Sequence, residues 1–347
     1  MPAAGAAVLQ ARLEHLPRLP LVTGPTPLQE APRLSAALGG PRILIKRDDL
    51  TGLMFGGNKV RQMEFVLGAA LAEGADVFIC GGGGAQSNHA RVGAAAARVA
   101  GLHPVVVVQP SEDSSIQGNA LLVRLLGAEV RVEPELASAP PGRLAQLDCR
   151  RSVMERIAAE YRARGSVPYV LVGSSIPLAV LGYVVASLEL HAQFEAQGIH
   201  PDVIFVSSSA ATQAGLELGR RLLGGSYRIV GVGHTPAENQ APTWIAQLAS
   251  GAADLLGTPL AIDACTIEHD LGSTGPAYGV LTHPAREAMA LLARTEGLPL
   301  DPVYTAKAMA GLIDWVRCGR LRSDATAVFV HTGGLPALFA YGETVLD

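Results

Sequence analysis

Residues 77–108, VFICGGGGAQSNHARVGAAAARVAGLHPVVVV, decide the fold class. An apolar run at 77–80 is followed by four glycines, an alanine-rich stretch at 87–100 and a second apolar run at 104–108. Continuous apolar runs of this length are typical of strands buried on both faces of a parallel sheet. A strand, a helix and a second strand in this order predict a crossover connection, the unit from which α/β proteins are built.

The same alternation continues on both sides of this segment. Helices are predicted at 58–73 and 212–223, in addition to the one at 87–100. Further strands are predicted at 42–46, 129–132, 169–172, 203–206, 228–231 and 327–330. We therefore expect an α/β fold whose strands are mostly parallel and are covered by helices on both faces.

Length and composition limit the class of protein. The chain has 347 residues, more than a single hydrophobic core usually contains, so two domains are expected. Hydrophobic residues make up 49% of the chain and charged residues 17%, which excludes a disordered protein. The net charge of −4 leaves no basic surplus to neutralise phosphates, so no nucleic-acid partner is expected.

Other sequence features bear on location and metal binding. No window of eighteen apolar residues is free of charges and helix breakers, so no membrane span is expected. The first twenty residues lack the basic region of a secretory signal. The cysteines, at 80, 149, 265 and 318, are widely spaced and predict reduced thiols, with neither a disulfide framework nor a metal site. We expect a cytoplasmic protein.

In open α/β sheets, ligands bind where the carboxyl ends of strands turn into helices. One such turn, TGLMFGGNK at 51–59, places Lys59 at the start of the predicted helix 58–73. Burial and the positive end of the helix dipole would lower the pKa of its amine, and a neutral amine is the nucleophile that forms a Schiff base. Taken alone, this segment fits a surface lysine at a helix N-terminus better.

Two further turns are rich in small and hydroxyl-bearing residues. GGGGAQSNH at 81–89 lets backbone N–H groups approach a ligand, and its Ser87 and Asn88 begin the next helix, which suits a carboxylate or phenolate oxygen. SSSAATQAG at 207–215 suits a phosphate. It has neither the GxxxxGK[ST] pattern nor the GxGxxG pattern of nucleotide-binding loops, so a different phosphate-bearing cofactor is favoured. The serine-rich turn fits an ordinary helix N-cap equally well, and His89 alone is more typical of a core or capping histidine.

Three more candidates lie toward the C-terminus. Tyr278 is within GPAYG at 275–279, and Tyr304 is within DPVYT at 301–305, just before an alanine-rich stretch. Thr332 follows the last predicted strand at its carboxyl end, within HTGG. Either tyrosine could equally be a packing residue with a satisfied hydroxyl group.

Taken together, these segments resemble one known family. The motifs GGNK (56–59), QSNH (86–89), DPVYT (301–305) and HTGG (331–334) are similar to those of the D-cysteine desulfhydrase and 1-aminocyclopropane-1-carboxylate (ACC) deaminase family, in the same order. KRDD at 46–49 and KAMAGL at 307–312 belong to the same resemblance, which extends from about residue 26 to residue 341. Members of this family are enzymes that depend on pyridoxal 5′-phosphate (PLP).

The resemblance implies the tryptophan synthase β-like fold, also called PLP fold type II. This is an α/β fold with two open, mostly parallel, twisted sheets flanked by helices. Residues 1–48 and 166–347 would form a large PLP-binding domain, and residues 49–165 a smaller inserted α/β domain. Relatives are dimers, so a homodimer is expected.

The resemblance also implies roles for single residues. Lys59 would bind PLP covalently and move the Cα proton, and Asn88 would donate a hydrogen bond to the cofactor's phenolate oxygen. Ser87, with the backbone N–H groups near Asn88 and His89, would bind the substrate carboxylate. Tyr278 and Tyr304 would line the substrate face of the cofactor. Thr305 and Thr332 would lie near its pyridine nitrogen. The phosphate would be bound by Ser208, Ser209, Ala210, Ala211 and Thr212.

The expected reaction is that of a PLP-dependent lyase. A threonine hydroxyl cannot keep the pyridine nitrogen protonated as an aspartate does, and the weaker electron withdrawal suits β-elimination. ACC deaminases carry glutamate where this chain has Thr305 and glutamine where it has His89. The resemblance therefore favours β-elimination with deamination of a small amino acid such as D-cysteine, giving pyruvate, ammonia and sulfide.

Three departures from the family pattern leave alternatives open. Residues 207–211 contain no glycine, GSSI at 173–176 replaces the GGSN of relatives, and Leu281 stands where proline is common. The alternatives are an ACC deaminase, an L-cysteate sulfo-lyase and a biosynthetic enzyme of β- or γ-replacement. A non-catalytic PLP carrier is disfavoured because such a protein needs no tyrosines that face a substrate. A nucleotide-binding dehydrogenase is disfavoured because the GxGxxG glycine pattern is absent.

Overall fold

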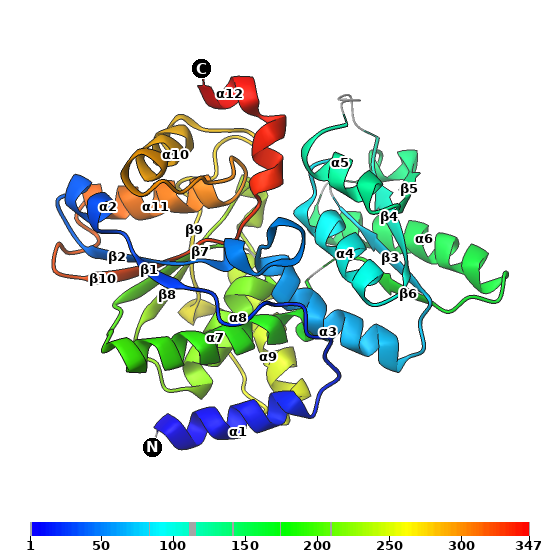
Figure 1. The fold of residues 1–347 in the computed structure, drawn as a ribbon, viewed down its shortest axis with the longest axis horizontal. Helices are drawn as coiled ribbons and strands as arrows, with labels where there is room; N and C mark the ends of the chain where they lie inside the picture. The colour runs from blue at the N-terminus through cyan, green and yellow to red at the C-terminus, as the bar shows by residue number, and fades with distance from the viewer. Residues whose placement is uncertain are drawn as a thin grey trace.

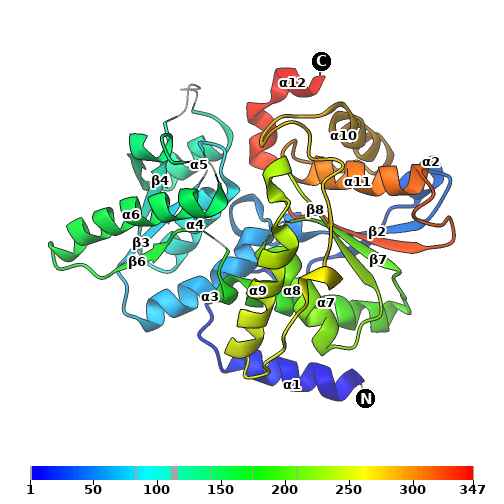
Figure 2. The same ribbon diagram turned by 180° about the vertical axis from the view of Figure 1, so that it is seen from behind.

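The computed structural model describes residues 2–82, 84–110, 116–140, 142–173, 175–208 and 210–346. Figures 1 and 2 show two units side by side, each built on its own sheet. The strands are β1 (Leu28–Glu30), β2 (Arg42–Lys46), β3 (Val77–Gly81), β4 (His103–Val108), β5 (Glu129–Val132), β6 (Pro168–Leu171), β7 (Val203–Ser207), β8 (Arg228–Val232), β9 (Glu268–Asp270) and β10 (Thr326–Val330).

Helices cover both faces of each sheet (Figure 1). They are α1 (Pro2–Glu14), α2 (Pro32–Ala37), α3 (Asn58–Ala72), α4 (Asn88–Val99), α5 (Gly118–Leu125), α6 (Arg143–Arg162), α7 (Pro177–Gln197), α8 (Ala211–Leu222), α9 (Ala241–Leu255), α10 (His283–Glu296), α11 (Thr305–Arg317) and α12 (Gly342–Leu346).

The larger sheet has the order β1-β2-β10-β7-β8-β9, and all its neighbouring strands are parallel except β1 and β2. Alternate residues of the central strands point to opposite faces. Phe205 and Phe329 pack in the core beneath α10 and α11, whereas Ile204 and Val328 pack with residues of α7 and α8. Burial on both faces explains why these strands are continuous apolar runs.

The smaller sheet has the order β5-β4-β3-β6, and its strands are all parallel. Ile79 of β3 packs with residues of α6, and its neighbour Phe78 lies in the core that contains α3 and α4. Helix α6 crosses the outer face of this sheet, as Figure 2 shows from behind. The fold class expected from the sequence is confirmed: two mostly parallel sheets with helices on both faces.

The predicted strands and helices agree with the structure to within one residue at each end. The short strands β1 and β9, each of three residues, were not predicted. The division into domains stays a proposal, but its boundary at residue 165 needs one correction. Strand β6 pairs with β3, so the smaller unit extends at least to Leu171.

Helix α7 bears on the expectation that no segment spans a membrane. By length and composition alone, this helix could cross one, and it was not expected to pass that test. However, 56% of its apolar window is buried inside the protein, where it packs against α3, α8 and α9. A core helix of a globular protein has the same composition, so this is weak support for a membrane span.

A buried ionic cluster joins β2, α3 and α7 at the base of the larger unit. Both carboxylate oxygens of Asp48 accept hydrogen bonds from Arg61, at 2.9 Å from Nε and 2.8 Å from Nη2. Glu189 accepts a further bond from Arg61 and is paired with Lys46. Burial raises the pKa of Asp48, but the charge and hydrogen bonds of Arg61 outweigh it and lower that pKa to about 2.

We expect Arg61→Leu to lower the free energy of unfolding by about 3–5 kcal/mol, because it leaves two buried carboxylates with one cation. Urea unfolding at pH 7 measures the loss. Since the pKa of Asp48 is lower in the folded protein, the stabilisation is present above pH 4 and is lost as the pH falls through about 2. The control, Arg42→Leu, breaks the exposed ion pair with Glu30 and should cost less than about 1 kcal/mol. Equal losses in the two variants would contradict a special role for the buried cluster.

Candidate active site

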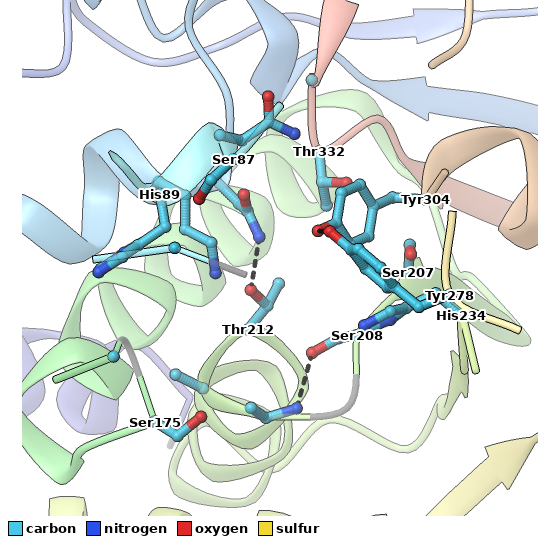
Figure 3. Close-up of a pocket in the computed structure, with 18 of the residues that line it drawn as sticks. Ser87, His89, Ser175, Ser207, Ser208, Thr212, His234, Tyr278, Tyr304 and Thr332 are labelled. Carbon is cyan, nitrogen blue, oxygen red and sulfur yellow. Dashed lines mark hydrogen bonds between the residues drawn. The ribbon is translucent and has the colours of Figure 1, made fainter. Parts of the chain in front are cut away.

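A cavity of about 260 Å³ lies where the carboxyl ends of strands from both sheets face one another (Figure 3). The turns after β3, β6, β7, β8 and β10 all contribute residues to its lining. The first turns of α3, α4 and α8 also line it, so three helix N-termini face one space. This is the edge at which open α/β sheets bind ligands.

The structure brings most of the predicted site residues together. Those that line the cavity are Lys59, Ser87, Asn88, His89, Ser208, Ala210, Ala211, Thr212, Tyr278, Tyr304 and Thr332. Ser209 lies outside the described residues. Thr305 does not line the cavity: it is fully buried, and its hydroxyl donates to the carboxylate of Asp301 at 2.7 Å.

Lys59 lies in the first turn of α3. The chain contains three lysines, and the other two are fully buried. Lys46 donates to the carbonyl of Thr26 and the side chain of Gln193, and Lys307 donates to the carbonyls of Thr274 and His234. Lys59 is therefore the one lysine that reaches the cavity.

The loop before Lys59 is held in an uncommon backbone conformation. Met54 and Phe55 have φ of 43° and 65°, positive backbone angles that residues other than glycine rarely adopt. Gly57 has φ of 111°, and a Cβ there would lie 2.9 Å from the carbonyl oxygen of Thr332. The backbone N–H of Asn58 donates to that same oxygen at 3.0 Å, so this close approach ties Lys59 to the end of β10.

The orientation of Asn88 is set by Asn119 of α5. The Asn119 amide nitrogen donates to Oδ1 of Asn88 at 2.9 Å and to the carbonyl of Gln86 at 2.8 Å. Because its oxygen is engaged in this way, Asn88 has its own amide N–H groups available for an acceptor in the cavity. Ser87 caps α4 by accepting from the N–H of Ala90, and its hydroxyl proton likewise stays available.

The serine-rich loop forms without glycine. No described residue of 207–212 has a positive φ, so the side chains there cause no backbone strain. Ser208 Oγ accepts from the N–H of Gln213, in the first turn of α8, at 3.0 Å. Thr212 Oγ1 accepts from the amides of Asn58 and Gln62, at 2.9 and 3.1 Å, which leaves its proton to donate.

Tyr278 and Tyr304 form one pair of hydroxyl groups, 2.5 Å apart. Tyr304 is partly buried, and this burial raises its pKa well above the usual value, with Tyr278 nearby adding to the shift. Tyr278 exposes 49% of its surface, and partial burial raises its pKa as well. Both are protonated near neutral pH, so the pair has one proton left to donate to a ligand.

His89 lines the cavity as a neutral ring. Burial lowers its pKa to about 3, and the charges of Lys59 and Arg150 add to this effect. Both of its ring nitrogens are buried without a hydrogen-bond partner in the described part of the chain. In Figure 3 it lies on the opposite side of the cavity from Tyr278 and His234.

Several lining residues were not among the predicted site residues. They are Asn58, Arg150, Ser175, Ser207, His234 and Glu238. His234 and Glu238 form an ion pair of 2.9 Å in the turn after β8, so applying the strand-end rule to that turn could have found them. Arg150 lies within α6, far along the chain from the end of any strand, and no sequence signal marks it.

Comparisons with known proteins agree with this geometry. The family model of pyridoxal-phosphate-dependent enzymes matches residues 19–333. The chain therefore belongs to this family of PLP-dependent enzymes, and its fold is the PLP fold type II.

Within the family, the similarity is to the group that the motifs indicated. The chain is 39% identical over 335 residues to a D-cysteine desulfhydrase of Salmonella schwarzengrund, covering 95% of this chain and 97% of that protein. It is 41% identical over 336 residues to a D-cysteine desulfhydrase of Klebsiella pneumoniae, with the same coverage. A crystal structure of an ACC deaminase homologue superimposes with a TM-score of 0.86 at 36% identity, covering 97% of this chain and 98% of that one.

We expect Gly57→Ala to destabilise the protein by more than about 2 kcal/mol, because the new methyl group meets the Thr332 carbonyl and φ is positive. Gly74→Ala is the matched control at the other end of α3, since Gly74 also has a positive φ but no atom within 4 Å of the added methyl group. It should cost about 1–2 kcal/mol. Urea unfolding of both variants measures the difference, and a smaller loss for Gly57→Ala would refute the close approach.

Proposed function

We propose that this protein binds PLP through Lys59 and catalyses β-elimination with deamination of a small amino acid such as D-cysteine, giving pyruvate, ammonia and sulfide. One observation carries the proposal: Lys59 lines the same cavity as hydrogen-bond donors suited to a phosphate, a phenolate and a carboxylate. The D-cysteine desulfhydrases to which the chain is about 40% identical support the substrate.

The donor set fits the cofactor. The first amides of α8 have no acceptor within the helix, and their end of the helix dipole favours an anion such as the PLP phosphate. Thr212 has a hydroxyl proton to donate there, and Oγ of Ser207 is buried without a partner among the described residues. On the other side, the free amide N–H of Asn88 suits the phenolate oxygen. When bound, PLP supplies an electron-withdrawing ring that stabilises negative charge at Cα.

The substrate would be oriented by α4 and by the tyrosine pair. The N-terminal amides of α4 and the hydroxyl of Ser87 suit the α-carboxylate. The side-chain amine of Lys59, in its neutral form, would remove the Cα proton. Tyr278 and Tyr304, whose pKa values are raised by burial, would donate the shared proton to the departing sulfur.

The overall reaction balances with water as the only added reactant. The Cα–H bond breaks and leaves its electron pair on carbon, and the Cβ–S bond breaks with its electron pair on sulfur, which leaves as sulfide. The three-carbon enamine that remains takes up water and loses ammonia to give pyruvate. His89, whose pKa is lowered to about 3 mainly by burial, is neutral near pH 7 and adds no positive charge to the cavity.

A second candidate is ACC deamination, supported by the match to the ACC deaminase homologue. Its product would be 2-oxobutyrate in place of pyruvate, so product analysis separates the two. We also propose a cytoplasmic location, because the four cysteines are free thiols. A homodimer is proposed by resemblance to the family.

The visible absorption spectrum of the PLP-loaded protein, before and after adding D-cysteine, tests the proposal. At neutral pH we expect an absorption band of the bound cofactor that changes as soon as D-cysteine is mixed in. Pyruvate and sulfide should then form in equal amounts. A band that does not respond to D-cysteine but responds to ACC, with 2-oxobutyrate formed, would replace the proposal by the second candidate. If PLP is added and the unbound cofactor is then removed by gel filtration, the absence of a protein-bound band would refute both.

A further inference from the structure

Arg150 is a cation with no carboxylate partner among the residues that the structure describes. It projects from α6 and lines the cavity, and its Nε is buried without a hydrogen-bond partner. Among the described residues, neither a side-chain hydrogen bond nor a carboxylate acts on its guanidinium group, whose pKa is lowered mainly by burial. The buried arginines of the same protein differ: Arg61 is paired with Asp48 and Glu189, and Arg91 donates to Asn119.

The position of Arg150 is on the substrate side of the cavity. Its Cδ lies 3.7 Å from where a Cβ of Gly81 would be, at the start of the loop that ends in Ser87. Arg150 also interacts electrostatically with His89 and with Tyr278. These two residues face each other across the cavity (Figure 3). The helix N-terminus assigned to the cofactor phosphate, that of α8, belongs to the other unit.

The charges that line the cavity do not balance around Arg150. Glu238 is the one carboxylate among the described lining residues, and it is already engaged by His234. One of its carboxylate oxygens lies 2.9 Å from Nε2 of His234, and it accepts from the backbone N–H of that residue at 3.0 Å. A half-buried guanidinium without a carboxylate partner is disfavoured by desolvation, which indicates that a ligand supplies the anion.

We propose that Arg150 binds an oxyanion at the end of the ligand's side chain, so that the site prefers substrates whose leaving group on Cβ is anionic, such as a sulfate ester, over neutral analogues. This inference rests on the proposed function, in which the cofactor and the α-carboxylate are bound by α8 and α4. With a sulfate ester, the Cβ–O bond breaks with its electron pair on oxygen and sulfate leaves. Lys59 takes the Cα proton, and water converts the remaining enamine to pyruvate and ammonia.

Binding of two unreactive acids tests the role of Arg150 without any turnover. Succinate and butyrate have the same carbon chain but two carboxylates and one, respectively, and isothermal titration of the PLP-loaded enzyme at pH 8 gives both dissociation constants. We expect succinate to bind about 10- to 100-fold more tightly than butyrate. This ratio should fall to about threefold or less in Arg150→Gln and stay intermediate in Arg150→Lys.

The matched control is Arg156→Gln. Arg156 lies farther along α6, is about half exposed, and pairs with Glu133 and Glu135 at the surface, so its loss should leave the ratio unchanged. Equal affinities for succinate and butyrate in the unmodified enzyme would overturn the inference. An equal loss of both affinities in Arg150→Gln would also overturn it, because it would assign Arg150 to the α-carboxylate or to the structure.

Turnover separates this inference from the proposed function. Serine O-sulfate and O-acetylserine, each as both enantiomers, differ in the charge of the ester group before it leaves: the sulfate ester is an anion and the acetate ester is neutral. Arg150→Gln should raise KM for the sulfate at least tenfold and leave KM for the acetate ester within twofold. If neither ester nor D-cysteine reacts, β-elimination fails while the succinate ratio still decides the role of Arg150. If D-cysteine reacts but the variant raises KM for both esters alike, the inference on Arg150 fails alone.

Discussion

The fork of hydrogen bonds made by Arg91 is the interaction on which the geometry of the site depends. This buried side chain of α4 donates to the carbonyls of Met54 and Gly56 and, through Nε, to Oδ1 of Asn119 at 2.7 Å. The first two bonds stabilise the left-handed loop that leads to Lys59. The third orients Asn119, which in turn orients Asn88. One guanidinium group therefore couples the lysine to the amide proposed to bind the same cofactor.

The opposite side of the site depends on the end of β10. Gly333 donates its N–H to Nδ1 of the buried His331, whose Nε2 donates to the carbonyl of Pro299. These bonds fix the turn that contains Thr332, the residue whose carbonyl approaches Gly57. Segments from residues 51 to 59 and 331 to 333, far apart in the chain, are thus packed backbone to backbone. Such contacts need glycine, which explains why GGNK and HTGG are informative motifs.

The sequence was a good guide wherever the chemistry lies at strand ends. Strands buried on both faces are continuous apolar runs, so their ends, and the turns that carry Lys59, Ser87 and Thr212, could be located without a structure. It was a poor guide to residues that reach the site from elsewhere. Arg150 comes from the middle of α6, and Thr305, although part of a motif, is turned toward Asp301. Strands β1 and β9 are too short for a pattern, and the pairing of β6 with β3 depends on the tertiary structure.

The central claim is that Lys59 carries the cofactor, and covalent mapping tests it most directly. Borohydride reduction of the PLP-loaded protein would fix the cofactor on its lysine, and trypsin would release that lysine within residues 48–61, between Arg47 and Arg61. Mass spectrometry should find the phosphopyridoxyl group on this peptide, at Lys59. Labelling of Lys46 or Lys307, or of no lysine at all, would contradict the assignment of Lys59.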